Sequence, residues 1–183
     1  MEAVFLDTCV LLKSYLCDTL LSLAEDGTYR PLWSAGVLEE LRRNLLRLGI
    51  KPEAVDHRLE QMTAFFPDAQ VTGYEDLIPA MTNHPKDRHV LAAAVVGRAD
   101  VLVTENLADF PAETAQPHGI EVYSQDEFLL GQLELYPRQV RDTLRRQASR
   151  YRREPRTVDG LLTVLATPGH GCARFAERCR RLL

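Results

Sequence analysis

The sequences Ala3-Val4-Phe5-Leu6-Asp7 and Val101-Leu102-Val103-Thr104 decide the fold, because each is a short apolar run that ends on a polar residue. Apolar runs of this length, bounded by helical patterns, predict buried strands. Three further strands are expected at about residues 30–33, 69–72 and 120–123. Strands that alternate with helices form a parallel sheet covered on both faces. The predicted fold class is therefore α/β, with three α/β/α layers.

Helical patterns fill the segments between the strands. Ser34 is a suitable N-cap for the second helix, and the last helix of this part is apolar nearly all round. These helices are expected at about residues 9–25, 35–48, 52–66 and 87–98. From Asp126 onward the pattern is wholly helical, with helices at about 126–135, 137–151, 157–166 and 172–182. We therefore divide the chain into an α/β domain, 1–135, and a helical extension, 136–183.

Composition indicates a folded protein outside the membrane. Of its 183 residues, 45% are hydrophobic and 26% are charged. The longest apolar run, Val90 to Val96, is too short to span a bilayer, and the acids Glu2 and Asp7 do not fit a secretory leader. We expect a cytoplasmic protein. The four cysteines form no C-x-x-C pair and are expected to be buried or inert thiols: Cys9, Cys17, Cys172 and Cys179.

Three aspartates lie after a predicted strand or at the start of a predicted buried helix, where a parallel sheet would gather them. Asp7 follows the first strand, Asp87 opens a buried helix, and Asp109 lies in the loop after the strand that ends at Thr104, together with Asn106. In an open parallel sheet, ligands bind at the carboxyl ends of the strands. Taken singly, each acid is also explained as a turn, a cap or a surface residue. Together they predict a site.

Helical geometry separates Glu40 from its neighbour Glu39. Counting about 100° per residue from Val37, Glu40 falls at about 300° and Asn44 at about 340°, on the margin of the apolar stripe. Glu39 falls at about 200°, facing water. Glu40 is therefore the candidate for a site in a cleft, with Asn44 as a supporting residue.

Clustered carboxylates repel one another and raise each other's pKa unless a cation is bound. Oxygen ligands without His or Cys select Mg²⁺ or Mn²⁺. Such an ion activates water for attack on a phosphate. The predicted metal ligands and catalytic residues are Asp7, Glu40, Asp87 and Asp109.

Four motifs in this order resemble a PIN domain, and more narrowly the VapC-type ribonucleases of toxin–antitoxin pairs. They are Phe5-Leu6-Asp7-Thr8, Ser34 to Leu45 with Glu40 before a leucine, His84-Pro85-Lys86-Asp87 before an alanine-rich helix, and Thr104-Glu105-Asn106-Leu107-Ala108-Asp109-Phe110. The resemblance covers residues 1–135, and all four family acids are present. It implies that Thr8, Thr104 and Asn106 support the site.

The resemblance further implies a Rossmann-like PIN fold and a metal-dependent endoribonuclease. The expected products carry 5′-phosphate and 3′-hydroxyl ends. It also implies an RNA substrate, a homodimer and a small antitoxin protein that covers the cleft.

Two other enzyme classes do not fit the residues. A haloacid-dehalogenase phosphatase needs a second acid where Cys9 stands, and a cysteine phosphatase needs an arginine six residues after its cysteine, where Tyr15 and Leu23 stand. The remaining alternative is a PIN-like module that binds RNA without cleaving it. The complete set of acids argues against that alternative.

The net charge of −4 conceals an asymmetry. Residues 137–183 hold twelve arginines against four acids, a formal charge of +8, which leaves −12 on residues 1–136. A basic surface of this kind suits a polyanion, although solvated helix faces would carry the same charge. We predict that five arginines flanking a thin apolar stripe bind RNA phosphates: Arg138, Arg141, Arg145, Arg146 and Arg150.

Overall fold

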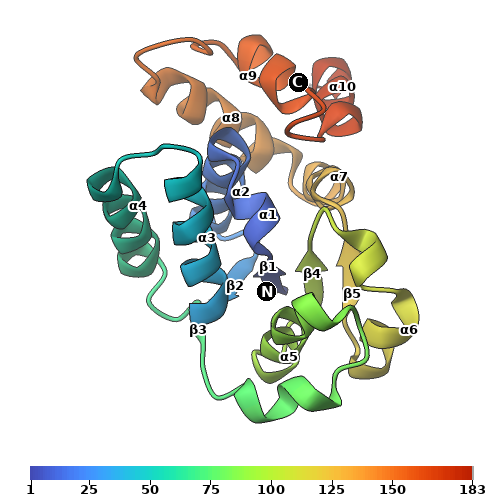
Figure 1. The fold of residues 1–183 in the computed structure, drawn as a ribbon. Helices are drawn as coiled ribbons and strands as arrows, with labels where there is room; N and C mark the ends of the chain where they lie inside the picture. The colour runs from blue at the N-terminus through green and yellow to red at the C-terminus, as the bar shows by residue number, and fades with distance from the viewer. Residues whose placement is uncertain (183) are drawn as a thin grey trace.

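The computed structural model describes residues 1–182 and contains a five-stranded parallel sheet (Figure 1). The strand order is β3-β2-β1-β4-β5, so the first strand lies at the centre of the sheet. The strands are β1 (Ala3–Leu6), β2 (Arg30–Ser34), β3 (Gln70–Val71), β4 (Val101–Val103) and β5 (Glu121–Tyr123). The predicted three-layer α/β/α class is confirmed.

Helices connect and cover these strands. In the first part of the chain they are α1 (Thr8–Leu11), α2 (Ser14–Glu25), α3 (Ala35–Arg47), α4 (Pro52–Phe65), α5 (Arg88–Val96) and α6 (Ala112–Ala115). Short 3₁₀ helices are η1 (Glu75–Ala80), η2 (Pro85–Asp87), η3 (Leu107–Asp109) and η4 (Gln116–His118). The division at residue 135 leaves α7 (Gln125–Leu135) as the last helix of the α/β domain. The extension consists of α8 (Pro137–Arg150), α9 (Val158–Leu165) and α10 (Ala173–Leu182). No helix among residues 1–182 is long and apolar enough to cross a membrane.

The prediction of a single helix over residues 9–25 is wrong. The chain forms two helices there, because Lys13 adopts an extended conformation with φ −84° and ψ 108°. That conformation directs the Lys13 ammonium into an ion pair with Glu105, the residue that follows Thr104 after β4. The periodic leucines alone could not reveal the break, and the partner of Lys13 lies 92 residues away along the chain.

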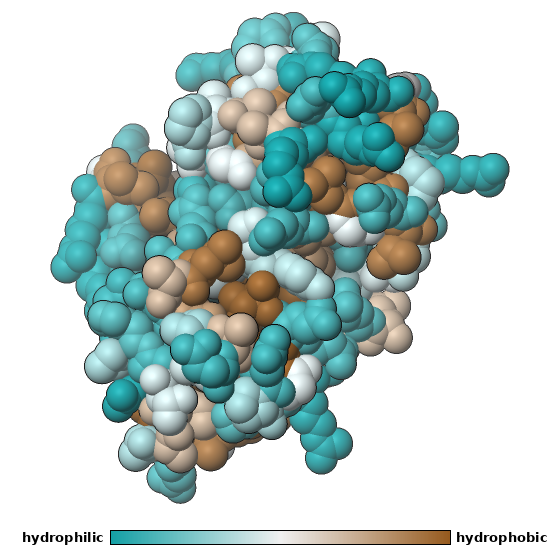
Figure 2. Space-filling view, turned by 90° about the vertical axis from the view of Figure 1, so that its right-hand side faces the viewer, coloured by the Kyte–Doolittle hydropathy of each residue, from teal (hydrophilic) through white to brown (hydrophobic). Residues whose placement is uncertain are grey.

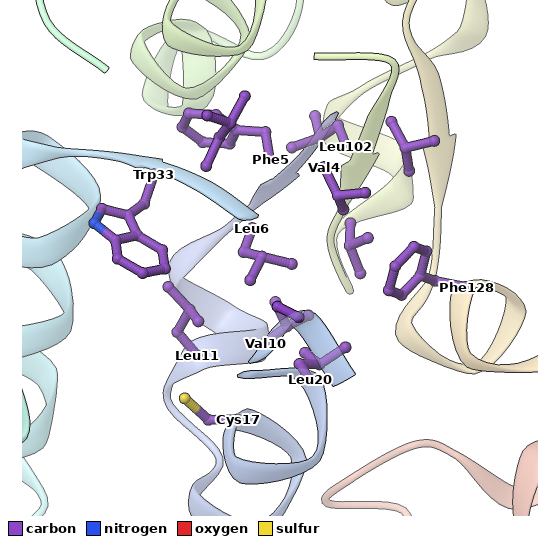
Figure 3. Close-up of a cluster of buried hydrophobic side chains, with 14 of the residues drawn as sticks. Val4, Phe5, Leu6, Val10, Leu11, Cys17, Leu20, Trp33, Leu102 and Phe128 are labelled. Carbon is purple, nitrogen blue, oxygen red and sulfur yellow. The ribbon is translucent and has the colours of Figure 1, made fainter. Parts of the chain in front are cut away.

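Side chains of the central strand fill both sides of the sheet (Figure 3). Phe5 points toward α5, whereas Leu6 points the opposite way, toward Val10 and Leu20 of α1 and α2. All four of these side chains are fully buried. This alternation follows from the strand's period of two and fixes which helix covers each face.

The helical extension packs on α2 through a buried polar contact as well as apolar side chains. Gln147 of α8 is fully buried. Its Nε2 donates to the Tyr15 carbonyl at 3.0 Å and to the Tyr151 hydroxyl at 2.8 Å, while its Oε1 accepts from Thr19 Oγ1 at 2.8 Å. The apolar stripe predicted on α8 is confirmed, because Val140, Leu144 and Ala148 are buried and Tyr151 is half-buried.

Candidate active site

Asp7 lies at the carboxyl end of β1, where it caps α1. Its Oδ1 accepts the Thr8 backbone N–H at 2.7 Å, and its own backbone N–H donates to the Val103 carbonyl of β4 at 3.1 Å. The residue is only 3% exposed. The pairing of β1 with β4 therefore fixes the backbone of this acid, and the first turn of α1 fixes one of its carboxylate oxygens.

Thr104 holds the second oxygen of Asp7. Its hydroxyl donates to Asp7 Oδ2 at 2.7 Å, and the same hydroxyl accepts the Asn106 backbone N–H at 3.0 Å. The Cys9 thiol also donates to Asp7 Oδ2, at 3.4 Å. The threonine predicted to support the site thus contacts the acid directly, while Asn106 reaches it only through its backbone.

Glu40 of α3 faces the same region. The Thr8 hydroxyl donates to Glu40 Oε2 at 3.2 Å and lies 3.4 Å from the Val37 carbonyl. Glu40 is half-buried and Glu39 is exposed, as the helical geometry predicts. Asn44 is also half-buried, but no side-chain hydrogen bond joins it to the rest of residues 1–182.

Asp87 and Asp109 meet on the other side of the site, together with His84. One ligand atom from each of the three residues lies within 4.8 Å of the others. The backbone helps to join them, because the His84 N–H donates to the Asp109 carbonyl at 3.1 Å. Asp87 is 4% exposed, Asp109 is half-buried and His84 is exposed. We name Asp7, Glu40, Asp87 and Asp109 the carboxylate cluster.

The acids of the carboxylate cluster act on one another electrostatically. The pKa of Asp87 is raised to about 6, first by burial and then by the charge of Asp7 and the neighbouring Asp109 carboxyl, while the charge of Lys86 opposes the rise. Burial also raises the pKa of Asp7, and the charge of Glu40 adds to this, although the hydrogen bonds from Thr104 and Cys9 oppose the rise. Asp7 is therefore the link between the two sides of the site.

The cluster fits a divalent cation. Asp87 Oδ2 is buried and has no hydrogen-bond partner among the described residues. A buried carboxylate oxygen without a partner is costly, and a cation would satisfy it while neutralising the repulsion with Asp7 and Asp109. Carboxylates are the ligands that Mg²⁺ and Mn²⁺ prefer.

Sequence reasoning missed His84 and Cys9 as members of this region. His84 precedes Pro85 in a loop whose path to Asp109 cannot be read from periodicity. Cys9 was assigned only as an inert thiol. Its pKa is raised to about 12 by burial and by the charge of Asp7, so its chemistry agrees with that assignment, but its contact with Asp7 was not foreseen.

The predicted RNA-binding arginines of α8 do not share one environment. Arg146 pairs with Asp26, and Arg150 pairs with Asp18 at 2.8 Å, so both are turned toward α2. Arg141 pairs with Asp142 on its own helix at 3.0 Å. Arg138 and Arg145 are exposed and form no ion pair within residues 1–182. Their contact with RNA stays a prediction.

Comparison with known families places the chain. Residues 3–108, more than half of the chain, match the model described as PIN domain, and the chain belongs to this family. Residues 125–181 match the model described as VapC50 C-terminal domain. The predicted resemblance is thereby confirmed. The division between residues 135 and 136 stays a prediction, and the second match begins before it, at α7.

A curated relative comes from Mycobacterium tuberculosis (strain ATCC 25618 / H37Rv) and is named "Putative ribonuclease VapC50". It is 46% identical over 110 residues, which cover 60% of this chain and 63% of the relative. The match thus spans less than two thirds of that protein. No solved structure matches the chain.

The raised pKa of Asp87 predicts a pH-dependent effect on stability. A folded-state pKa of about 6 means that the folded protein holds this proton more tightly than the unfolded chain. The resulting stabilisation is present below about pH 4 and is lost as the pH rises through 6. In metal-free protein, Asp87→Asn should therefore raise the free energy of unfolding by about 1–2 kcal/mol at pH 7.5, a figure reduced for solvent in the cleft.

Urea unfolding in EDTA measures this effect, and the gain should nearly vanish at pH 4. Exposed Asp68, substituted in the same way, should change little at either pH. An equal gain from Asp87→Asn at pH 7.5 and at pH 4 would show that the substitution acts by packing and not by removing an unfavourable buried charge.

Proposed function

We propose that this protein is a metal-dependent endoribonuclease and the toxin component of a toxin–antitoxin pair. The supporting observation is the carboxylate cluster, in which the buried charges of Asp7 and Asp87 act on each other at the carboxyl edge of a PIN-domain sheet. The name of the mycobacterial relative points the same way. A PIN-like module that only binds RNA is the alternative, but binding alone would not need four acids in this arrangement.

In this proposal Asp7, Glu40, Asp87 and Asp109 hold Mg²⁺ or Mn²⁺, directly or through water. When bound, the ion supplies Lewis-acid activation of water and charge neutralisation at the scissile phosphate. Thr104 and the Thr8 backbone orient the two oxygens of Asp7, and the Thr8 hydroxyl orients Glu40. One carboxylate of the cluster accepts the proton of the attacking water.

The proposed partners follow from the family. They are an RNA substrate, a small antitoxin protein that covers the cleft and a second copy of the chain. We place the protein in the cytoplasm, where its RNA substrates are found.

Asp7→Asn should abolish cleavage while sparing the fold and RNA binding. Loss of this ligand should lower the cleavage rate by about 100-fold or more, since even second-layer partners of a metal cost 10- to 100-fold. The measurement is cleavage of a total RNA pool with Mg²⁺, with Mn²⁺ and with EDTA, beside Asp68→Asn as a matched control. If the parent protein, folded and free of any antitoxin, leaves RNA intact with either metal, the binding-module alternative is correct.

His84 should bias the site toward Mn²⁺. Imidazole nitrogen suits transition-metal ions better than Mg²⁺, so His84→Gln should weaken Mn²⁺ binding by about tenfold and leave Mg²⁺ binding nearly unchanged. Isothermal calorimetry with each ion tests this, with His57→Gln on α4 as the control for an exposed histidine. Equal losses for both ions would mean that His84 is not a ligand.

Arg138 and Arg145 are the members of the α8 set that remain free for RNA. Arg145 also lines a groove of about 240 Å³ with Arg141 and Arg180. Figure 2, which views the side of α6 and α10, shows strongly hydrophilic side chains gathered over its upper part, where the C-terminal helices lie.

Arg138→Glu combined with Arg145→Glu should weaken RNA binding and flatten its salt dependence by about one unit of log–log slope for each lost phosphate contact. The assay is fluorescence anisotropy across a salt series. Arg30→Glu, at the amino end of β2, is the control. An unchanged slope in the double variant would assign these arginines to solvent or to a protein partner.

A further inference from the structure

The loop between α9 and α10 reaches the edge of the sheet that carries the carboxylate cluster. Its residue His170 presents a backbone carbonyl to Gln125, in the first turn of α7, and Gln125 Nε2 donates to it at 3.0 Å. The same Nε2 donates to Glu105 Oε1 at 2.9 Å. Glu105 directly follows Thr104, so Gln125 connects the extension to the loop that orients Asp7.

The hydrogen bonds continue from Glu105 to Asp7. The Glu105 backbone N–H donates to Cys9 Sγ at 3.2 Å, and the Cys9 thiol donates to Asp7 Oδ2 at 3.4 Å. Lys13 forms an ion pair with the Glu105 carboxylate and holds that side chain from the other direction. We name the series His170, Gln125, Glu105, Cys9 and Asp7 the hydrogen-bond chain.

The contact between the loop and Gln125 is close. Gly171 has φ +70°, and a Cβ at this position would lie 2.7 Å from Gln125 Nε2. Only glycine allows the loop to approach the amide so closely without strain. The backbone of the extension is therefore fitted to the Gln125 side chain.

Gln125 is a poor choice for packing alone. The side chain is 4% exposed, and its Oε1 is buried without a partner among the described residues. A buried amide oxygen without a hydrogen-bond partner is unfavourable, and an apolar residue of similar shape would avoid that penalty. What the glutamine provides is the pair of bonds donated by Nε2.

We propose that Gln125 is a positioning residue. Through it the docked C-terminal helices fix Thr104 and Glu105, the residues that follow β4, and hence the Asp7 carboxylate. In this view the extension completes the acid site, independently of any contact that its arginines make with RNA. The role in cleavage rests on the proposed nuclease function, whereas the role in holding Glu105 and the metal-binding geometry does not.

The test substitutes Gln125 by methionine, which keeps the length of the side chain and removes both donated bonds. The matched control is Gln132→Met on the same helix, since Gln132 is equally buried, also has an unpartnered Oε1 and lies outside the hydrogen-bond chain. The readouts are Mn²⁺ affinity by electron paramagnetic resonance, hydrogen exchange at the Glu105 amide, and RNA cleavage, with urea unfolding to compare stability.

Gln125→Met should lower Mn²⁺ affinity and the cleavage rate by about tenfold, the low end of the range for second-layer partners of a metal site, because Glu105 and Cys9 stand between Gln125 and Asp7. It should also accelerate exchange of the Glu105 amide, while Gln132→Met behaves like the parent. Equal changes in the two variants would assign the effect to general loosening of α7 and overturn the proposal. Parental behaviour of Gln125→Met in both exchange and Mn²⁺ affinity would overturn it as well.

Glu105 offers a second pair of variants. Glu105→Gln keeps an oxygen that accepts from Gln125 and should retain most of the parental Mn²⁺ affinity, whereas Glu105→Ala should resemble Gln125→Met. Equal losses in both Glu105 variants would show that the Lys13 ion pair, and not the bond from Gln125, holds the loop. If the parent binds Mn²⁺ but cleaves no RNA, the nuclease function fails while exchange and metal binding still decide the role of Gln125.

Discussion

The pairing of β1 with β4 is the constraint on which the candidate site depends. Leu6 lies opposite Val103 in the parallel register, so the next residues of both strands, Asp7 and Thr104, emerge side by side. The 2.7 Å hydrogen bond between them follows from that register. A shift of one residue would turn Asp7 to the other face of the sheet and remove it from Glu40 and Asp87. The buried apolar side chains of both strands, which prevent such a shift, therefore also maintain the chemistry of the edge.

Asp7 and Asp87 are buried to a similar degree but are satisfied differently. Asp7 accepts hydrogen bonds from the Thr8 backbone, the Thr104 hydroxyl and the Cys9 thiol, all of which stabilise its charged form. Asp87 has an oxygen with no partner among residues 1–182, and its pKa is raised to about 6. The protein thus fixes one acid in place and leaves the other in need of a proton or a cation. This asymmetry is what favours a metal site over a set of structural caps.

Much of this arrangement could be predicted from local patterns, because strands and amphipathic helices follow short periods. The angle of Glu40 on α3 followed from the apolar stripe of a single helix. The ion pair of Lys13 with Glu105, the approach of His84 to Asp109 and the bond from Gln125 to Glu105 could not be predicted, since each joins two segments distant in sequence. The arginines of α8 were likewise predicted as one surface, and only their packing on α2 separates Arg146 from Arg145.

The packing of α8 on α2 accounts for part of the basic charge in the extension. Arg146 faces Asp26, at the end of α2, and Arg150 faces Asp18 within that helix, so part of the basic charge of the extension serves to dock it on the acidic domain. Exposed ion pairs contribute little each, about 0–1 kcal/mol, and weaken with salt. The fully buried Gln147 and the apolar stripe of α8 must therefore carry most of the docking free energy. Because docking does not engage every arginine, the extension is able to place its loop against Gln125 and still present Arg138 and Arg145 to a polyanion.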